Sequence, residues 1–173
     1  IEGVVIHPDH DTLVHADDDA LAGVARVIRG YHDAVADFPS AGRTWGENGA
    51  DPIGPYELVC HNDLAPWNLV RGDDGAWTFI DWDLAAPGRR AWDLGWALLG
   101  LIPLMPRQAP EPHVVSRRLE RFRVAYGSEA FPDDVLAVAA ERCSHEASRI
   151  LRLGQSGTEP YAKLLADGHA ETW

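Results

Sequence analysis

The sequence predicts a mostly helical α+β fold in which a small β-hairpin interrupts a series of helices. Two patterns support this class. Apolar residues recur at helical spacing over long segments on both sides of the chain's middle, and short apolar pieces bounded by turn residues lie between positions 56 and 81. With 173 residues and a hydrophobic fraction of 46%, the chain is long enough for one domain with its own core.

The N-terminal third is expected to contain one amphipathic helix. Residues 1–15 mix a short apolar stretch with His and Asp, which indicates a strand or an extended linker. Three aspartates at 17–19 are suited to the cap and first turn of a helix over about 18–37. Its apolar face is formed by Leu21, Val24, Ile28, Tyr31 and Val35. The segment 39–55 is rich in Gly, Pro and Asp and is predicted to be a loop.

The middle of the chain is expected to contain the strands. Residues 56–60 have the composition of a short strand, and 68–81 that of a hairpin whose turn is Gly72-Asp73-Asp74-Gly75. Pro87-Gly88 breaks the pattern. Residues 92–101 are apolar on nearly all sides, which predicts a buried helix.

The C-terminal part is expected to be helical after a proline-rich connector that begins at Pro103. Helices are predicted at about 113–126, 132–153 and 158–169. Pro132-Asp133-Asp134 is expected to start the second of these helices, and Gly154 is expected to end it.

Composition excludes several classes of function. Fifteen Lys and Arg residues against 27 Asp and Glu give a net charge of −12, which argues against a nucleic-acid partner. No apolar run approaches the roughly 20 residues of a membrane span, and residues 1–7 have no features of a secretory signal. Two cysteines, Cys60 and Cys143, do not form a disulfide framework, so a reducing cytoplasm is the expected compartment.

Polar residues cluster at the ends of the predicted strands, where a scaffold usually presents its chemistry. The loop after the first strand contains His61, Asp63 and Asn68, and the strand that ends at Ile80 is followed by Asp81. An Asn carbonyl and an Asp carboxylate are hard oxygen ligands suited to Mg²⁺. A second Asp nearby can accept the proton of an attacking hydroxyl, so the constellation indicates phosphoryl transfer.

These motifs resemble those of the aminoglycoside phosphotransferase and choline kinase group, which shares the protein-kinase-like fold. The resemblance rests on three motifs in order: His61-x-Asp63-x₄-Asn68, then Ile80-Asp81-Trp82-Asp83, then Ala91-Trp92-Asp93-Leu94-Gly95. It covers about residues 18–125. It implies an ATP-dependent (or GTP-dependent) phosphotransferase that acts on a hydroxyl of a small molecule, with aminoglycoside-like acceptors leading and choline-like, amino-sugar and homoserine-like alcohols behind.

The resemblance also implies a role for each residue. Asp63 is expected to be the catalytic base, and Asn68 and Asp81 are expected to hold Mg²⁺ and, through it, the nucleotide phosphates. His61 is expected to brace the catalytic loop, and Asp93 to bond that loop's backbone from the buried helix. Val70 and Ile80 are expected to form part of the floor beneath the adenine, while Asp83 is either a metal-side or a structural carboxylate.

The family also has an N-terminal lobe with a Gly-rich loop, a strand Lys and a helix Glu. Here no such loop precedes Asp63, and the single Lys is Lys163. We therefore interpret residues 1–15 as the end of an inter-lobe linker and 16–173 as the C-terminal lobe, with the nucleotide lobe absent. Such a chain alone is expected to be a weak or inactive kinase that self-associates through the exposed surface.

Several alternatives remain open on the residues alone. The chain can be a truncated or degenerate lobe that only binds a small molecule or a partner, or a metal-dependent hydrolase using Asp63, Asp81 and Asp83. A nucleophile at Cys60 is disfavoured, because adjacent strand residues point to opposite faces. The tryptophans at 67 and 82 are expected in the core rather than on a ligand, and His32 is expected to be a packing residue. Acidic residues of the C-terminal helices, Glu111, Glu120, Glu141 and Glu146, either attract a cationic substrate or form solvated faces.

Overall fold

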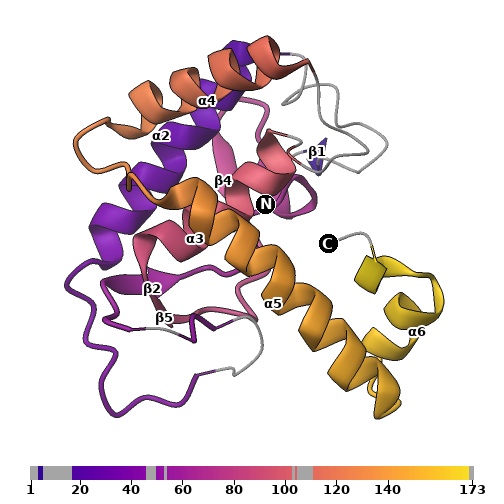
Figure 1. Ribbon diagram of the computed structural model, residues 1–173. Helices are drawn as coiled ribbons and strands as arrows, with labels where there is room; N and C mark the ends of the chain where they lie inside the picture. Colours follow the sequence, from indigo (N-terminus) through magenta and orange to yellow (C-terminus); the bar gives the residue numbers. More distant parts are fainter. Residues whose placement is uncertain are drawn as a thin grey trace.

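The structure is a computed structural model that describes residues 4–5, 17–45, 50–52, 54–102, 104 and 111–171. Helices make up most of it, with two small antiparallel sheets, as the sequence predicts (Figure 1). The helices are α2 (Asp18–Val35), α3 (Arg90–Leu101), α4 (Pro112–Tyr126), α5 (Val135–Gln155) and α6 (Tyr161–Ala166), with 3-10 turns η2 (Pro66–Asn68) and η3 (His169–Glu171). The strands are β1 (Val4–Val5), β2 (Leu58–Cys60), β3 (Leu69–Arg71), β4 (Trp77–Phe79) and β5 (Ala86–Gly88).

The predicted hairpin is confirmed. Strands β3 and β4 pair antiparallel, with Leu69 opposite Phe79, and Gly75 at the turn has a φ of +81° that a residue without a Cβ adopts readily. Strand β1 adds to the other edge of β3, with Val5 opposite Val70. The rest of the segment 1–15, interpreted as a linker, lies outside the described residues, as does most of the proline-rich connector.

The second sheet joins β2 to β5 and was not predicted. Leu58 pairs with Gly88 and Cys60 with Ala86. The segment of Pro87-Gly88 that the sequence marks only as a break is therefore a strand. Its residues have little intrinsic strand preference, so the pairing comes from the tertiary fold.

The predicted helices are all present, but some of their ends differ: α5 begins at Val135 and not at Pro132, and α6 is shorter than the predicted 158–169. Asp17 caps α2 by accepting the backbone N–H groups of Asp19 and Ala20. Gly154 does not end α5, which continues to Gln155. A Cβ at Gly154 would lie 2.7 Å from the side chain of Leu165, so this glycine instead allows the close approach of α6.

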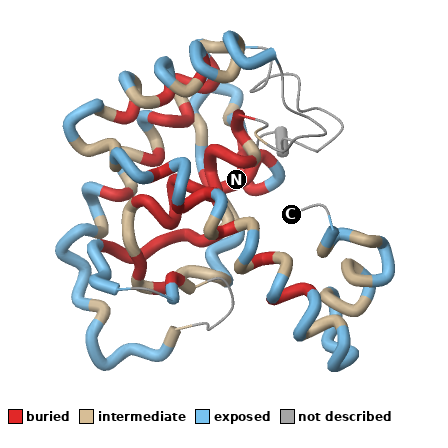
Figure 2. Tube along the Cα trace, viewed as in Figure 1, coloured by how far each residue is buried: buried red, intermediate tan, exposed pale blue. Residues whose placement is uncertain are grey.

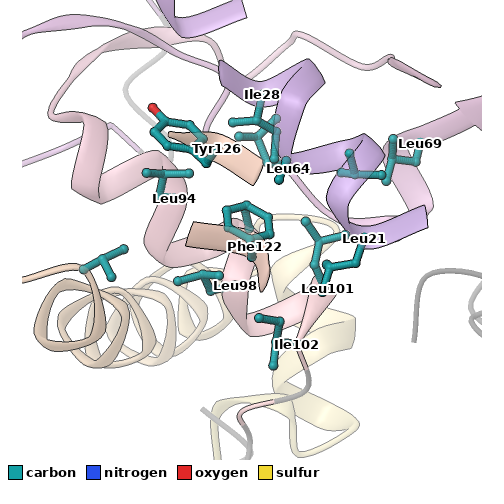
Figure 3. Packing of buried hydrophobic residues seen from close by; sticks show 14 of the residues in the cluster. Leu21, Ile28, Leu64, Leu69, Leu94, Leu98, Leu101, Ile102, Phe122 and Tyr126 are labelled. Carbon is teal, nitrogen blue, oxygen red and sulfur yellow. The ribbon is translucent and has the colours of Figure 1, made fainter. Parts of the chain in front are cut away.

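The core lies between α2, α3 and α4 (Figures 2 and 3). Leu21 and Ile28 from α2 meet Leu94 and Leu98 from α3, and α4 closes the core with Phe122; all five side chains are fully buried. Helix α5 packs along α3, and its C-terminal half extends past the core to α6 (Figure 1). Within the described part of the chain, no helix has the length and apolarity to span a membrane.

The contact between α3 and α5 is so close that one added methyl group would force the two helices apart by a few tenths of an ångström. A Cβ at Gly95 would lie 3.1 Å from both N and Cα of Ala139, which are backbone atoms that a side-chain rotation does not move. We expect Gly95→Ala to lower the free energy of unfolding by about 1–3 kcal/mol, measured by urea denaturation. Gly30→Ala is the matched control, because α2 has nothing within 4 Å of that position. It should raise stability by up to about 1 kcal/mol, and equal effects of the two variants would contradict the packing argument.

Candidate active site

The loop after β2 is held by a carboxylate from the first turn of α3. Asp93 is fully buried, its Oδ2 accepts the backbone N–H of His61 at 2.9 Å, and its Oδ1 accepts that of Asn62 at 2.8 Å. Burial by itself raises the pKa of Asp93. The hydrogen bonds from His32 and from the backbone of His61 outweigh it, so this pKa lies below its ordinary value. The ionised carboxylate is therefore the form that the loop stabilises.

His32 is part of this anchor. The Arg90 side chain donates to the Tyr126 hydroxyl at 2.6 Å, and that hydroxyl lies 2.8 Å from Nδ1 of His32. Nε2 of His32 lies 3.2 Å from Oδ2 of Asp93. Because the Tyr126 hydroxyl accepts from Arg90, it donates its own proton to Nδ1 of His32. The ring proton of His32 is then on Nε2 and faces the Asp93 carboxylate. The sequence suggests only a packing residue, whereas the buried His32 links α2 and α4 to the loop anchor.

A second anchor holds the same loop from α5. Arg142 of α5 is buried, and its Nη2 donates to the Asn62 carbonyl at 2.9 Å. Its guanidinium carbon lies 4.6 Å from the ring centroid of Trp92 and 4.8 Å from that of Trp96. Burial lowers the pKa of Arg142 to about 10, so the group stays charged at neutral pH inside the protein. A buried charge costs free energy unless it has such partners. The presence of Arg142 here therefore indicates that it serves to hold the loop in position.

The two anchors fix an unusual backbone. Asn62 has a φ of +67°, in the left-handed region that costs most residues energy and that Asn tolerates better than others. Its Nδ2 donates to the Leu84 carbonyl at 2.8 Å. The backbone turn that precedes Asp63 is therefore held in one conformation.

The Asp63 carboxylate is oriented by three N–H donors. Oδ1 accepts Nε1 of Trp96 at 2.8 Å, and Oδ2 accepts Nδ2 of Asn68 at 2.8 Å and Nε1 of Trp67 at 3.4 Å. The side chain is partly exposed, so an acceptor molecule can reach it. A fixed, accessible carboxylate is what a general base requires.

His61 joins this loop to the end of the hairpin. Its Nδ1 accepts the backbone N–H of Asp63 at 3.2 Å, which places the ring proton on Nε2, 3.1 Å from the Ile80 carbonyl. The ring also lies 4.3 Å from that of Trp82, centroid to centroid. Both ring nitrogens are thus occupied by backbone groups, so His61 supports the loop and has no free position for proton transfer.

The two expected metal ligands lie at the same end of the hairpin. Nδ2 of Asn68 donates to the Asp63 carbonyl and carboxylate, so Oδ1 is the end of that amide left for a cation. The Asn68 carbonyl accepts the backbone N–H of Ile80 at 2.9 Å, immediately before Asp81. Asp81 is exposed and has a φ of +64°. Backbone strain of this kind often accompanies functional sites.

Asn68 and Asp81 can supply two of the oxygen ligands of Mg²⁺. Within the described ranges, no group of three or more His, Cys, Asp or Glu side chains converges on a metal-sized centre. An amide oxygen and one carboxylate are a suitable set for Mg²⁺, which usually retains waters and takes further oxygens from phosphates. Asn68 and Asp81 are therefore compatible with a metal held jointly with a phosphate-bearing molecule.

The remaining expected residues have mixed positions. Val70 is buried in β3, Ile80 is half-buried, and Asp83 is exposed. The expectation of core positions for two tryptophans is wrong, because Trp67 and Trp82 are each 42% exposed. Their indole N–H groups instead bond to the oxygens that border the loop and the hairpin end, Asp63 Oδ2 and the Phe79 carbonyl.

Cys60 has the environment of a structural thiol. Its side chain is fully buried, and Sγ lies 3.4 Å from the Arg89 carbonyl, away from the partners of His61. Burial, with the charge of Asp93, raises the pKa of the Cys60 thiol well above its ordinary value. A buried, protonated thiol is a poor nucleophile.

A cavity of about 280 Å³ opens beside the Asp63 carboxylate. Its walls come from the loop, from α3, and from the C-terminal elements α5, α6 and η3. The aromatic and aliphatic lining residues are Trp67, Leu84, Trp96, Ile150 and Leu164, and the charged ones besides Asp63 are Glu146 and Arg149. A mainly apolar hollow with a few polar groups is the usual form of a small-molecule site.

Of the four acidic residues considered for a cationic substrate, only Glu146 lies at this cavity. Glu120 pairs with Arg123 at 2.7 Å, and the Glu141 carboxylate lies 3.5 Å from Arg89. Glu111 is exposed at the start of α4. Three of the four therefore belong to other surfaces of the protein.

Comparison with known proteins assigns this arrangement to a family. The sequence profile of the phosphotransferase enzyme family matches residues 6–132, which is most of the chain and includes every residue expected at the site. The chain belongs to the phosphotransferase enzyme family. No curated protein and no solved structure matches the chain.

Two residues of the site, Arg142 and Trp96, are not marked by any motif of the phosphotransferase family in this sequence. Arg142 lies beyond the matched segment, and no motif marks it. Its signal is a charged residue among apolar ones on the core-facing side of a helix, because it follows Val138 and Ala139 at helical spacing. In the sequence, Trp96, the donor to Asp63, does not differ in pattern from the other apolar residues of a buried helix.

Proposed function

We propose that this member of the phosphotransferase family transfers the terminal phosphate of ATP to a hydroxyl of a small molecule. The observation that supports this most directly is the Asp63 carboxylate, which three N–H donors orient at the mouth of the cavity. Asp63 accepts the hydroxyl proton. The acceptor oxygen then bonds to the terminal phosphorus, while the bond from that phosphorus to the bridging oxygen of ADP breaks.

Asn68 and Asp81 would hold Mg²⁺, which neutralises charge on the phosphate oxygens when bound. His61 and Asp93 keep the loop in place and take no proton themselves in this scheme. Val70 and Ile80 would contact the adenine from the hairpin. Catalysis of this kind depends mostly on positioning and charge stabilisation, which agrees with the number of bonds devoted to the loop.

Asp63→Asn tests the assignment of the base. The amide keeps the size of the side chain but does not accept a proton, so transfer of labelled phosphate from ATP to an alcohol should fall by about 10²-fold or more. Asp73→Asn, in the exposed hairpin turn, is the matched control and should leave transfer unchanged. Measurable transfer that continues at an unchanged rate in Asp63→Asn would contradict the proposed role.

A second candidate is binding without phosphoryl transfer. Its supporting observation is the single lysine of this sequence, Lys163, which is exposed on α6 and pairs with Asp167 rather than with the hairpin that carries Asn68 and Asp81. Calorimetry with ATP and Mg²⁺ separates the two functions. Binding that disappears in Asp81→Asn supports transfer, whereas no binding at millimolar concentrations supports the second candidate.

A further inference from the structure

One charged residue of the cavity has unmet hydrogen-bonding capacity. Arg149 of α5 lines the cavity, and its side chain is only 9% exposed. Both carboxylate oxygens of Glu146 lie on a single nitrogen, Nη2, at 2.9 and 2.7 Å. Nε and Nη1 are buried and have no hydrogen-bond partner within the described part of the chain. Three N–H hydrogens of a buried cation thus lack an acceptor.

Such groups are rare, because an unpaired buried donor costs free energy. The contact with Tyr161 does not supply the missing acceptor. The guanidinium carbon of Arg149 lies 5.2 Å from the Tyr161 ring centroid, and a ring supplies no oxygen acceptor. Glu146 is the only other carboxylate in the described lining besides Asp63, and both of its oxygens are already bound. The missing acceptor is therefore expected from outside the protein.

The position of Arg149 connects it to the chemistry of Asp63. Both residues line one cavity, and the walls that accompany them, Trp67, Trp96 and Ile150, are apolar or aromatic. A molecule that fills the cavity therefore meets a base for its hydroxyl, an apolar surface for its body and, beside Glu146, the Arg149 cation, whose three unpaired N–H groups are covered in this structure. An ammonium group beside Arg149 would be repelled by the guanidinium, and the nearby Glu146 carboxylate is already bound to that guanidinium.

We propose that the phosphate acceptor is a small hydroxy acid whose carboxylate binds Arg149 while its hydroxyl faces Asp63. This inference rests on the proposed function, since it names the acceptor of that reaction. It also replaces the polycationic aminoglycoside-like acceptor that the family resemblance favours. Carboxylate oxygens are the strongest partners for guanidinium N–H groups.

Binding requires a small movement at the edge of the cavity. Nε and Nη1 are covered in this structure, and α6, which contributes Leu164 to the cavity wall, contains no buried residue. An element with so little burial separates from its neighbour at low cost. The acid is thus expected to reach Arg149 when α6 moves away from α5.

Three compounds with one carbon skeleton test the proposal on the chain as it is. The acid is 3-phenyllactate, the uncharged analogue is 3-phenylpropane-1,2-diol and the cationic analogue is 1-amino-3-phenylpropan-2-ol, each titrated by calorimetry. The acid should bind at least about tenfold more tightly than the diol, and the amine should bind most weakly. Equal binding of the three, including no detectable binding at millimolar concentrations, would overturn the proposal. So would inorganic phosphate binding as tightly as the acid, because the site would then serve a free anion.

Two variants locate the preference at Arg149. Glu146→Gln leaves Arg149 in place and should keep or increase the preference for the acid. Glu146→Gln/Arg149→Gln replaces the ion pair by two uncharged amides, so no buried charge is left alone, and the acid should lose its advantage over the diol. An acid preference that survives in the double variant contradicts the assignment.

Failure of this proposal and failure of the proposed function give different results. Binding of ATP with Mg²⁺ that depends on Asp81, together with a preference for the diol or the amine, rejects the hydroxy acid and retains phosphoryl transfer. A preference for the acid that disappears in the double variant, without nucleotide binding, retains the hydroxy-acid site and rejects transfer. Tighter binding of 1-amino-3-phenylpropan-2-ol in particular would restore a cationic acceptor.

Discussion

Asp93→Asn is expected to lower the free energy of unfolding by about 3–5 kcal/mol, because it turns an acceptor of three buried donors into a partial donor. In the native chain Asp93 accepts from the backbone of His61 and Asn62 and from His32. An amide oxygen satisfies at most one side of this arrangement, and the NH₂ group then faces another N–H. Urea denaturation at neutral pH measures the loss, which is a large part of the total stability of a domain this size.

The pH dependence identifies the mechanism of that loss. The pKa of Asp93 is lowered in the folded chain, so its ionised form contributes stability above the ordinary value of 3.8, and this contribution is lost as the pH falls through the lowered pKa. Asp93→Asn has no such group to protonate. The stability gap between the two proteins should therefore narrow below about pH 4.

A surface carboxylate provides the control. Asp33 is 51% exposed and pairs with Arg29 at 2.7 Å on α2. Asp33→Asn should change stability by no more than about 1 kcal/mol, as exposed ion pairs usually do. A gap of similar size for both variants, or an Asp93→Asn gap that stays constant down to acid pH, would contradict the anchor role.

Local patterns of the sequence are sufficient for the helices and the hairpin. The turn at Gly72–Gly75 and the flanking apolar pieces predict β3 and β4, because hairpin register depends on a short contiguous segment. The pairing of β2 with β5 was missed, since its two strands lie 25 residues or more apart and the second consists of Ala86, Pro87 and Gly88. Its stability comes from the surrounding fold, which a local pattern does not contain.

The residues of the site also divide into those that a local sequence pattern predicts and those that it does not. Asp63, Asn68, Asp81 and Asp93 belong to motifs, and the structure places all four around one loop and one hairpin end. The residues that hold or line the site from α5 do not belong to any motif. The buried face of α5 reads Val135, Val138, Ala139, Arg142, Glu146, Arg149 and Ile150. Charged residues at core-facing positions are the available signal, but their partners, such as Asn62 eighty residues earlier, follow only from the tertiary structure.

Asn62→Ala is expected to lower stability by about 2–4 kcal/mol through two separate effects. The first is backbone strain, because Asn62 has a φ of +67° and Ala tolerates this region less well. The second is the loss of side-chain bonds, since Nδ2 donates to the Leu84 carbonyl at 2.8 Å and Oδ1 lies 3.4 Å from Nη1 of Arg142. Urea denaturation gives the total.

Asn62→Gly separates the two effects, because Gly adopts a positive φ without strain but loses the same bonds. It should cost about 1 kcal/mol less than Asn62→Ala. In both variants the backbone N–H groups of His61 and Asn62 should exchange with solvent faster, since the loop loses its tie to Leu84 and part of its tie to Arg142. Equal stability of the Ala and Gly variants would mean that the left-handed turn stores no strain. Unchanged exchange at both amides would mean that the Asn62 side chain does not hold the loop, whose position would then depend on Asp93 and on the bond from Arg142 to the Asn62 carbonyl.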